Sequence, residues 1–448
     1  MALINPASKD IIPESLNLHA TLPTQVACEK AKYHIYLPKN PIEKDGPISF
    51  LAVSGDFDCI DPYNTYLDTK LQILKADGTR VVNADADNKL SLFVNGIGTA
   101  WIQHCDVKLN NKKISSNDNN YAHRADLENR LSYSVEVKEN SLRITGFDSE
   151  TLAFDDIPVA DLNLDDEANV ADKALNRRYE RSKMSKVIRV ITRVHTEICE
   201  QPKLLPPNSV LDFTFHPNEA SFVVMTKRDM KYQYKILECK LYVHHVRVNP
   251  TIARELEDIT IKGENMKYPV RRVEVTYFTK SEGMTDLSQP NIIQGKKPKR
   301  VIIGLLNLDA FHGHYKKDPF NYKHFNTREV SIRVDGERYP EEGMKMNVDE
   351  GDVLIPVMNL LMTTDSFLTD RDIGINLTNY LLRNNLFAFN LSPTGSSGGE
   401  NFELSTNVTV DAQIMLSAAT ATAVAVLVYA EYDSEIIIDA DRIVTYNE

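Results

Sequence analysis

Four histidines are the first side chains whose type and spacing could support chemistry. His312 and His314 flank a glycine and could place two imidazoles beside a metal ion. However, no carboxylate or third histidine stands near them in a spacing known for metal ligands. His244 and His245 are adjacent, so on a strand their side chains point to opposite faces and cannot hold one ion together. We therefore expect structural roles for all four histidines.

The sequence lacks the motifs that define the common enzyme classes. Gly295-Lys296 has neither the upstream glycine nor the following Ser or Thr of a phosphate-binding loop. GxGxxG, GxSxG and HExxH do not occur. A cupin-like metal enzyme would need a cluster of histidines and carboxylates on adjacent strands, and no motif supplies one. The sequence thus predicts no enzyme, no catalytic, cofactor-binding or metal-binding residues, and no cofactor.

Composition indicates a folded protein with more than one core. The 448 residues are 42% hydrophobic and 25% charged, which is close to the average for globular proteins. A formal net charge of −12 opposes condensation onto nucleic acid, so we expect no sequence-specific nucleic-acid binding. No apolar segment typical of a secretory signal occurs near the start, which predicts synthesis in the cytosol. The odd number of cysteines, without zinc spacing, predicts free thiols at Cys28, Cys59, Cys105, Cys199 and Cys239.

Most of the chain shows the alternation of apolar and polar residues that is typical of strands. Residues 66–74, 186–198, 211–216 and 329–334 all follow this period of two. Asp-Gly pairs at residues 77–78 and 335–336 follow two of these segments and predict tight hairpin turns. The apolar run at residues 418–430 is too short to span a bilayer and is expected to be a buried strand. Helical spacing occurs only over residues 121–133 and 353–362.

This pattern predicts an all-β protein built from sandwiches or barrels. We place a module boundary in the break at residues 249–267, after one expected strand and before the next. The stretch at residues 146–176 is strongly acidic and is expected to form a long exposed loop in the first module. The basic run at residues 296–300 could be a nuclear-localisation signal, but it precedes an apolar strand and fits solvated charge at a strand end better.

Several segments, in order, resemble the double jelly-roll major capsid proteins of Polinton (Maverick) and adintovirus-like elements. Residues 55–61 (GDFDCID) with 64–67 (NTYL) resemble the opening of that family's first module, although Pro62 replaces an apolar residue. Residues 101–110 and 120–125 (NYAHRA) resemble the segments that follow. The most specific matches are residues 268–272, 298–305, 309–313, 318–325 and 334–336, followed by 387–393 and 429–433. The acidic stretch matches none of the family's motifs.

This resemblance implies two tandem eight-stranded jelly rolls, which we place at residues 28–250 and 251–448 on either side of the break. Residues 1–27 are expected to form an N-terminal arm. It implies a homotrimer, or hexon-like capsomer, that contacts neighbouring capsomers and penton or minor capsid proteins in the shell of a virion. Nuclear assembly and an internal membrane are left open. A minor capsid protein and a cellular jelly-roll binding module are the alternatives, because fold alone does not fix function. The polar, proline-interrupted arm is expected to become ordered only on assembly.

Overall fold

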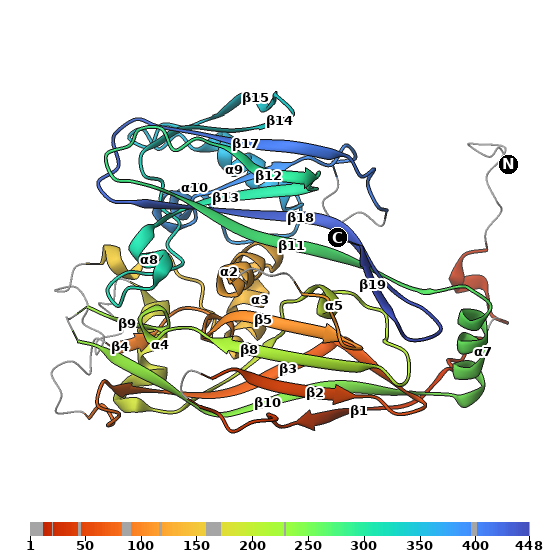
Figure 1. The fold of residues 1–448 in the computed structure, drawn as a ribbon. Helices are drawn as coiled ribbons and strands as arrows, with labels where there is room; N and C mark the ends of the chain where they lie inside the picture. Colours follow the sequence, from red (N-terminus) through yellow and green to blue (C-terminus); the bar gives the residue numbers. More distant parts are fainter. Residues whose placement is uncertain are drawn as a thin grey trace.

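The computed structural model describes residues 12–447, except residues 20, 44–45, 83–90, 116–118, 158–171, 228–229 and 396–400. Its strands form two stacked β-sandwiches, which we call the first and the second sandwich in chain order (Figure 1). The all-β prediction is confirmed, because antiparallel sheets make up both bodies.

The first sandwich contains two four-stranded sheets. One has the order β1-β10-β3-β7, and the other has the order β2-β8-β5-β6. The strands are β1 (Cys28–Tyr36), β2 (Ile48–Val53), β3 (Asp58–Lys75), β5 (Ile102–Leu109), β6 (Lys112–Lys113), β7 (Ile188–Arg193), β8 (Val210–Pro217) and β10 (Tyr232–Val248), with a short pair β4 (Ser91–Phe93) and β9 (Val224–Thr226). The predicted alternation is confirmed: Leu67 and Leu71 on β3 and Phe213 and Phe215 on β8 are buried in the core.

The second sandwich repeats this plan. Its sheets have the orders β11-β18-β13-β16, with β19 paired to β18, and β12-β17-β14-β15. The strands are β11 (Met266–Lys280), β12 (Gln289–Lys296), β13 (Arg300–Asn307), β14 (Thr327–Val334), β15 (Glu337–Lys345), β16 (Leu386–Asn390), β17 (Asn407–Leu416), β18 (Val424–Ile438) and β19 (Val444–Asn447). The expected buried strand at residues 418–430 therefore begins only at Val424, because residues 417–423 form the preceding loop.

Helices fill the ends of the sandwiches and the space between them. The two helices expected from spacing are confirmed as α2 (Tyr121–Ser132) and α9 (Leu354–Thr363). The others are α1 (Ile97–Ala100), α3 (Val135–Glu139), α4 (Lys173–Ser182), α5 (Glu197–Glu200), α6 (Ala220–Val223), α7 (Pro250–Ile261), α8 (Leu308–His312) and α10 (Leu377–Arg383), with 3-10 turns at Glu14–Leu16, Ser141–Thr145, Phe154–Asp156 and Lys183–Ser185. No helix within the described ranges has the length and apolar character needed to cross a membrane.

The connection between the sandwiches is not the open break that the sequence suggested. Residues 250–261 form α7, whose N-terminus is capped by the Asn249 side chain, which accepts a hydrogen bond from the Thr251 backbone N–H. Pro250 occupies the first turn, where its missing N–H costs no hydrogen bond. The Asn-Pro pair was therefore a helix start signal.

The two Asp-Gly turns have different outcomes. Asp335 and Gly336 have φ angles of 50° and 89° and join β14 to β15, so this hairpin is confirmed. Asp77-Gly78 does form a tight turn, closed by the Gly78 N–H donating to the Lys75 carbonyl. However, β3 pairs with β10 and β7, which come more than a hundred residues later, and not with the next described strand, β4, so the hairpin predicted there is wrong for the described residues.

The acidic stretch at residues 146–176 is not simply an exposed loop. Residues 158–171 lie outside the described part of the chain. Around them, the Asp148 side chain is fully buried and is paired with Arg177 at 2.9 Å and Arg181 at 3.2 Å. Asp172 is also buried and caps α4 by accepting from the Ala174 N–H. The expectation of exposure is wrong at these positions, since buried carboxylates are tolerated when they are paired.

Each sandwich completes the core of the other. Tyr268 and Val270 at the start of β11, and Ile436 and Ile438 at the end of β18, belong to the hydrophobic core of the first sandwich. In return, Leu127 and Leu131 on α2 belong to the core of the second. Figure 1 shows α2 lying between the two bodies. The sandwiches are therefore packed together through shared apolar side chains.

Candidate functional site

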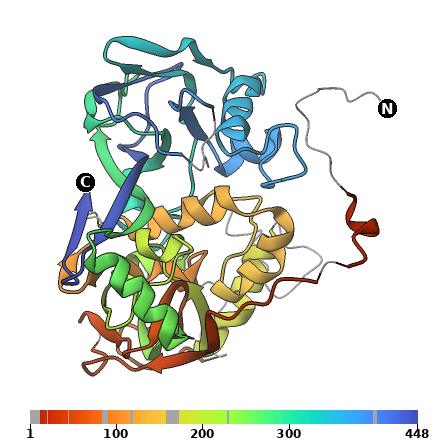
Figure 2. The same ribbon diagram turned by 90° about the vertical axis from the view of Figure 1, so that its right-hand side faces the viewer.

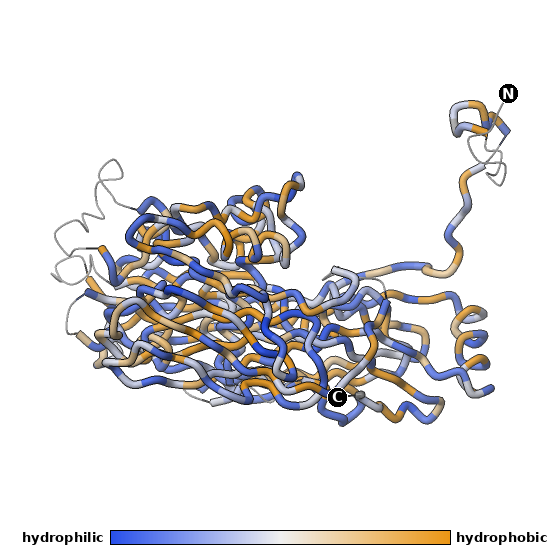
Figure 3. The backbone as a smooth tube through the Cα atoms, turned by 90° about the horizontal axis from the view of Figure 1, so that it is seen from above, coloured by the Kyte–Doolittle hydropathy of each residue, from blue (hydrophilic) through white to orange (hydrophobic). Residues whose placement is uncertain are grey.

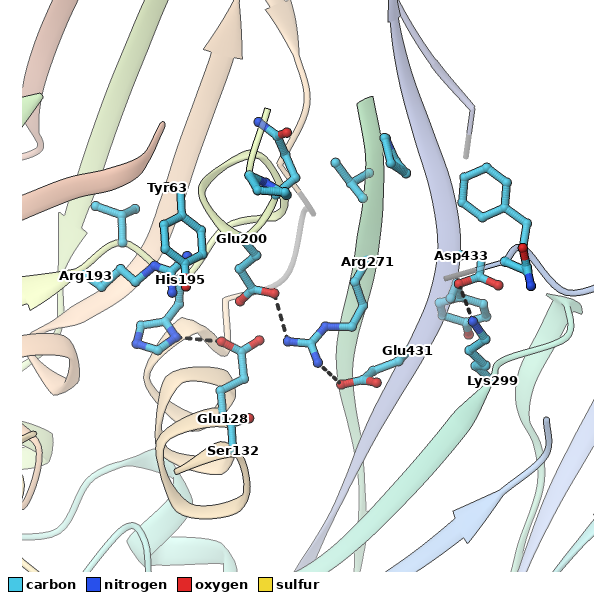
Figure 4. Close-up of a pocket in the computed structure, with 18 of the residues that line it drawn as sticks. Tyr63, Glu128, Ser132, Arg193, His195, Glu200, Arg271, Lys299, Glu431 and Asp433 are labelled. Atoms are coloured by element: carbon cyan, nitrogen blue, oxygen red, sulfur yellow. Dashed lines mark hydrogen bonds and ion pairs between the residues drawn. The ribbon is translucent and has the colours of Figure 1, made fainter. Parts of the chain in front are cut away.

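A pocket of about 600 Å³ lies where the two sandwiches meet (Figure 4). The first sandwich contributes Glu128 from α2, the loop that carries His195, and Glu200 from α5. The second contributes Arg271 from β11 and Glu431 from β18. The site is thus built by elements far apart in sequence.

Ion pairs run across this pocket from one sandwich to the other. Arg271 bonds Glu200 of the first sandwich at 2.8 Å and lies 3.3 Å from Glu431 of the second. Arg300 on β13 holds Glu431 through two bonds of 2.6 Å each, a bidentate geometry that favours Arg over Lys. Figure 4 shows Arg271 reaching between the two glutamates.

A second group of charges surrounds α2. Arg124 donates to Glu128 at 2.9 Å and to Glu197 at 2.7 Å, and all three side chains are at most 4% exposed. His195 Nδ1 lies 2.6 Å from Glu128. Buried charges of this kind must be paired, because an unpaired charge in the protein interior is costly.

Burial and nearby charges shift the pKa values of Glu431 and Glu200 in opposite directions. Burial alone would raise the pKa of Glu431, but Arg300 and Arg271 outweigh it and hold that pKa below its ordinary value. Burial and the nearby Glu128 carboxylate raise the pKa of Glu200. The carboxylate of Glu431 is therefore fixed as a charged partner, whereas Glu200 is held less firmly in its charged form.

Glu128, His195 and Glu200 bring three potential ligand atoms within 4.8 Å of one another. Each of these side chains is already engaged, by Arg124 and His195 on one side and by Arg271 on the other. We interpret the group as part of the ion network between the sandwiches. The expectation that the chain has no metal site stays a prediction.

A further buried ion network is centred on Arg383. Arg383 on α10 is 1% exposed; it pairs with Glu150 and lies 3.3 Å from Asp318, both also 1% exposed. Arg178 on α4 also pairs with Glu150. This network connects Glu150, at the start of the acidic stretch, with the second half of the chain.

The histidines singled out in the sequence lie apart from these networks. His312 packs against the rings of Tyr277 and Phe311, and His314 accepts a hydrogen bond from a backbone N–H. On β10, His244 lies 3.0 Å from Asp61, whereas the ring of His245 packs against that of His34. The adjacent pair thus uses opposite faces of the strand, as expected.

The basic run at residues 296–300 lies along the edge of the pocket. Lys299 pairs with Asp433 at 2.9 Å and is 8% exposed, and Lys296 donates to the Asp433 carbonyl. With Arg300 bound to Glu431, these charges contribute to the packing of β13 and β18. The expectation of solvated charge is therefore wrong at Lys299 and Arg300, which are paired and largely buried, and the localisation signal stays untested.

Sequence reasoning missed the ion networks, although one signal was present. Glu431 interrupts an apolar strand, Val424–Ile438, and a charge at such a position needs a buried partner. The sequence does not identify that partner, because Arg271 and Arg300 lie more than a hundred residues away along the chain.

We compared the sequence and the fold with those of known proteins. No family model matches the sequence. An uncharacterized protein of Caenorhabditis elegans is 22% identical over 431 residues, which cover 94% of this chain and 97% of that protein.

Two solved structures resemble the fold over almost the whole chain. A chain in the cryo-EM structure of the Sputnik virophage matches with a TM-score of 0.64 and 10% identity, covering 100% of this chain and 94% of that one. The mavirus major capsid protein matches with a TM-score of 0.53 and 10% identity, covering 99% and 96%. The chain therefore has the double jelly-roll fold found in viral major capsid proteins.

Proposed function

We propose that this protein is a major capsid protein of a Polinton-like or adintovirus-like element, forming homotrimeric capsomers that tile an icosahedral shell. The observation that carries the proposal is the similarity to capsid-protein structures along both sandwiches and the connection between them. The ordered motifs of the sequence support this lineage. So does a relative of nearly the same length in a nematode, as suits an element carried in an animal genome.

In this proposal the two sandwiches are the jelly rolls at residues 28–250 and 251–448, and they act as one rigid unit. Shared core residues and ion pairs such as Arg271 with Glu200 support that view. A trimer would then present six similar sandwiches, which suits packing on a pseudo-hexagonal lattice. A cyclic trimer closes its own heterologous interface, so contacts with neighbouring capsomers and penton or minor capsid proteins must use other surfaces.

The alternatives are disfavoured on different grounds. Two full sandwiches favour a major subunit over a minor capsid protein, which is usually a single jelly roll. A cellular binding module is expected to be a monomer with a ligand site. The pocket between the sandwiches is instead lined by charges that pair with each other.

Light scattering coupled to size-exclusion chromatography tests the proposal on the full chain. We expect a mass three times the chain mass of 50.7 kDa. Electron microscopy of the same fractions should show hexagonal particles or closed shells. A stable monomer at micromolar concentration, with no particles at higher concentration, would contradict it.

A further inference from the structure

Helix α9 exposes an apolar surface on the second sandwich. Its sequence, residues 354–363, contains no charged side chain. Val357 and Leu360 are buried in the second core, whereas Leu354 is 61%, Ile355 43% and Met362 50% exposed. A helix that is apolar on all sides is normally buried, so the exposed side of α9 is expected to be covered by something else.

The apolar surface extends beyond α9 into the following segment. Phe367 and Leu368 come soon after the helix, and Leu377 and Leu382 lie on α10, which contacts α9. All four are at least 36% exposed. We define the α9 face by the exposed residues Leu354, Ile355, Met358, Met362, Phe367, Leu368, Leu377 and Leu382.

A second segment with exposed apolar side chains among its polar residues precedes β1. Residues 15–27 contain no Lys, Arg, Asp or Glu, in a chain of which 25% is charged. Leu16, Leu18, Leu22 and Val26 are all between 65% and 87% exposed. Figure 3 shows the backbone of this segment running away from the body, with hydrophobic positions along it. From here on, the arm means residues 12–19 and 21–27, the part of the expected N-terminal arm that the structure describes.

Within the described part of the arm, a backbone hydrogen bond ties it to the body at its end. The Ala27 carbonyl accepts a hydrogen bond from the Asn249 N–H, and β1 begins at the next residue. From there the chain projects outward (Figures 1 and 2). Fifteen extended residues span up to about 50 Å, which is enough to reach a neighbouring molecule.

We propose that the arm of one copy of this chain binds the α9 face of a neighbouring copy. The two segments are complementary because each exposes several large apolar side chains, and neither residues 15–27 nor α9 carries a Lys, Arg, Asp or Glu. In Figure 2 the arm extends from the same side of the molecule toward which α9 and α10 lie. The arm is directed away from its own body, which favours a neighbour as its partner. Such an exchange is heterologous, as a cyclic trimer requires. This inference rests on the proposed function and adds the contact that joins the copies.

Cysteine cross-linking between differently tagged copies tests the contact. In a Cys28→Ser background, which removes the exposed native thiol, one copy carries Leu18→Cys and a co-expressed copy carries Met358→Cys. Mild oxidation should join the two tags in one disulfide-linked species. The matched control is Met284→Cys, a methionine of similar exposure on the second sandwich but outside the α9 face, which should give no such species.

Each result has a distinct meaning. A disulfide between the tags with Met358→Cys but not with Met284→Cys supports the proposal. A disulfide formed only within one chain, when both cysteines are placed on the same copy, overturns it in favour of the molecule's own arm. A disulfide with Leu256→Cys on α7 instead would overturn the proposal in favour of the exposed apolar side chains of that charged helix.

A second measurement separates this inference from the proposed function. Leu22→Asp and Met358→Asp should each raise the concentration at which trimers dissociate by at least ~10-fold, because each would bury a charge in an apolar contact. If both variants dissociate at the same concentration as the unmodified trimer, and the cysteine pair gives no cross-link, the inference is overturned and the proposed function stands. A monomer in the unmodified chain would overturn both.

Discussion

Replacing Arg383 tests whether the buried ion network holds the two halves of the chain together. Its guanidinium pairs with Glu150 and with Asp318 at 3.3 Å, and it donates to the Leu152 carbonyl at 3.1 Å. Arg383→Met keeps a long side chain but leaves Asp318 without its cation. Of the cations in the described part of the chain that pair with Glu150, Arg178 is then left.

The expected loss follows from the burial of all three groups. Because their side chains are each 1% exposed, removing one partner should cost about 3–5 kcal/mol of unfolding free energy. For a chain of this length, the unfolding entropy is roughly 0.9 kcal/mol per kelvin, so Tm should fall by about 3–5 °C. Differential scanning calorimetry and urea unfolding measure both quantities.

The control is an arginine in a more exposed pair. Arg338 on β15 bonds Glu329 with 34% of its side chain exposed, so Arg338→Met should cost no more than about 1 kcal/mol. Adding Asp318→Asn to Arg383→Met should recover part of the stability, because it removes the carboxylate that was left unpaired. Equal losses for Arg383→Met and Arg338→Met would refute the reasoning.

Three further predictions concern single positions. Burial among Phe222, Phe311 and Phe320 lowers the pKa of His123 to about 3. As the pH falls, His123 is therefore protonated in the unfolded chain before it is protonated in the folded chain. The free energy of unfolding should fall as the pH drops from about 6.5 toward 3. In urea titrations across this range, His123→Phe should lose up to ~1.4 kcal/mol per pH unit of that dependence, and an unchanged slope would contradict the assignment. Gly304→Ala would place a Cβ 2.7 Å from the Tyr322 ring, so it should destabilise the chain by about 1–3 kcal/mol in chemical unfolding, whereas a neutral result would mean that the ring yields. Native maleimide labelling counted by mass spectrometry should modify Cys28 alone, because burial shields the other four thiols and raises the pKa of Cys59 to about 11; rapid labelling of a second thiol would be inconsistent with this packing.

Local features of the fold could be predicted from local patterns. Alternation identified the buried faces of β3 and β8, spacing identified α2 and α9, and Asp335-Gly336 identified a hairpin. Each of these features depends on residues that lie close together in the sequence. Their signal is therefore present in the sequence itself.

Other features were misread because a local pattern has more than one structural outcome. Asn249-Pro250 is compatible with either a turn or the start of a helix. Here it starts α7, because the residues that follow are helical. The acidic residues near Asp148 suggested exposure, but Arg177 and Arg181 follow on α4 and pair with it. Charge by itself does not reveal burial when its partner lies on another element.

The sequence by itself determined that this chain forms two sets of strands without an enzyme motif, because period-two alternation and missing motifs are local properties. It also gave the order of segments that resembles capsid proteins. Only the tertiary structure decided that Arg271 joins Glu200 to Glu431, that each sandwich completes the core of the other, and that α9 is left uncovered. These features depend on contacts between residues far apart in sequence, since pairing and burial are settled when the sheets stack and not along any single strand.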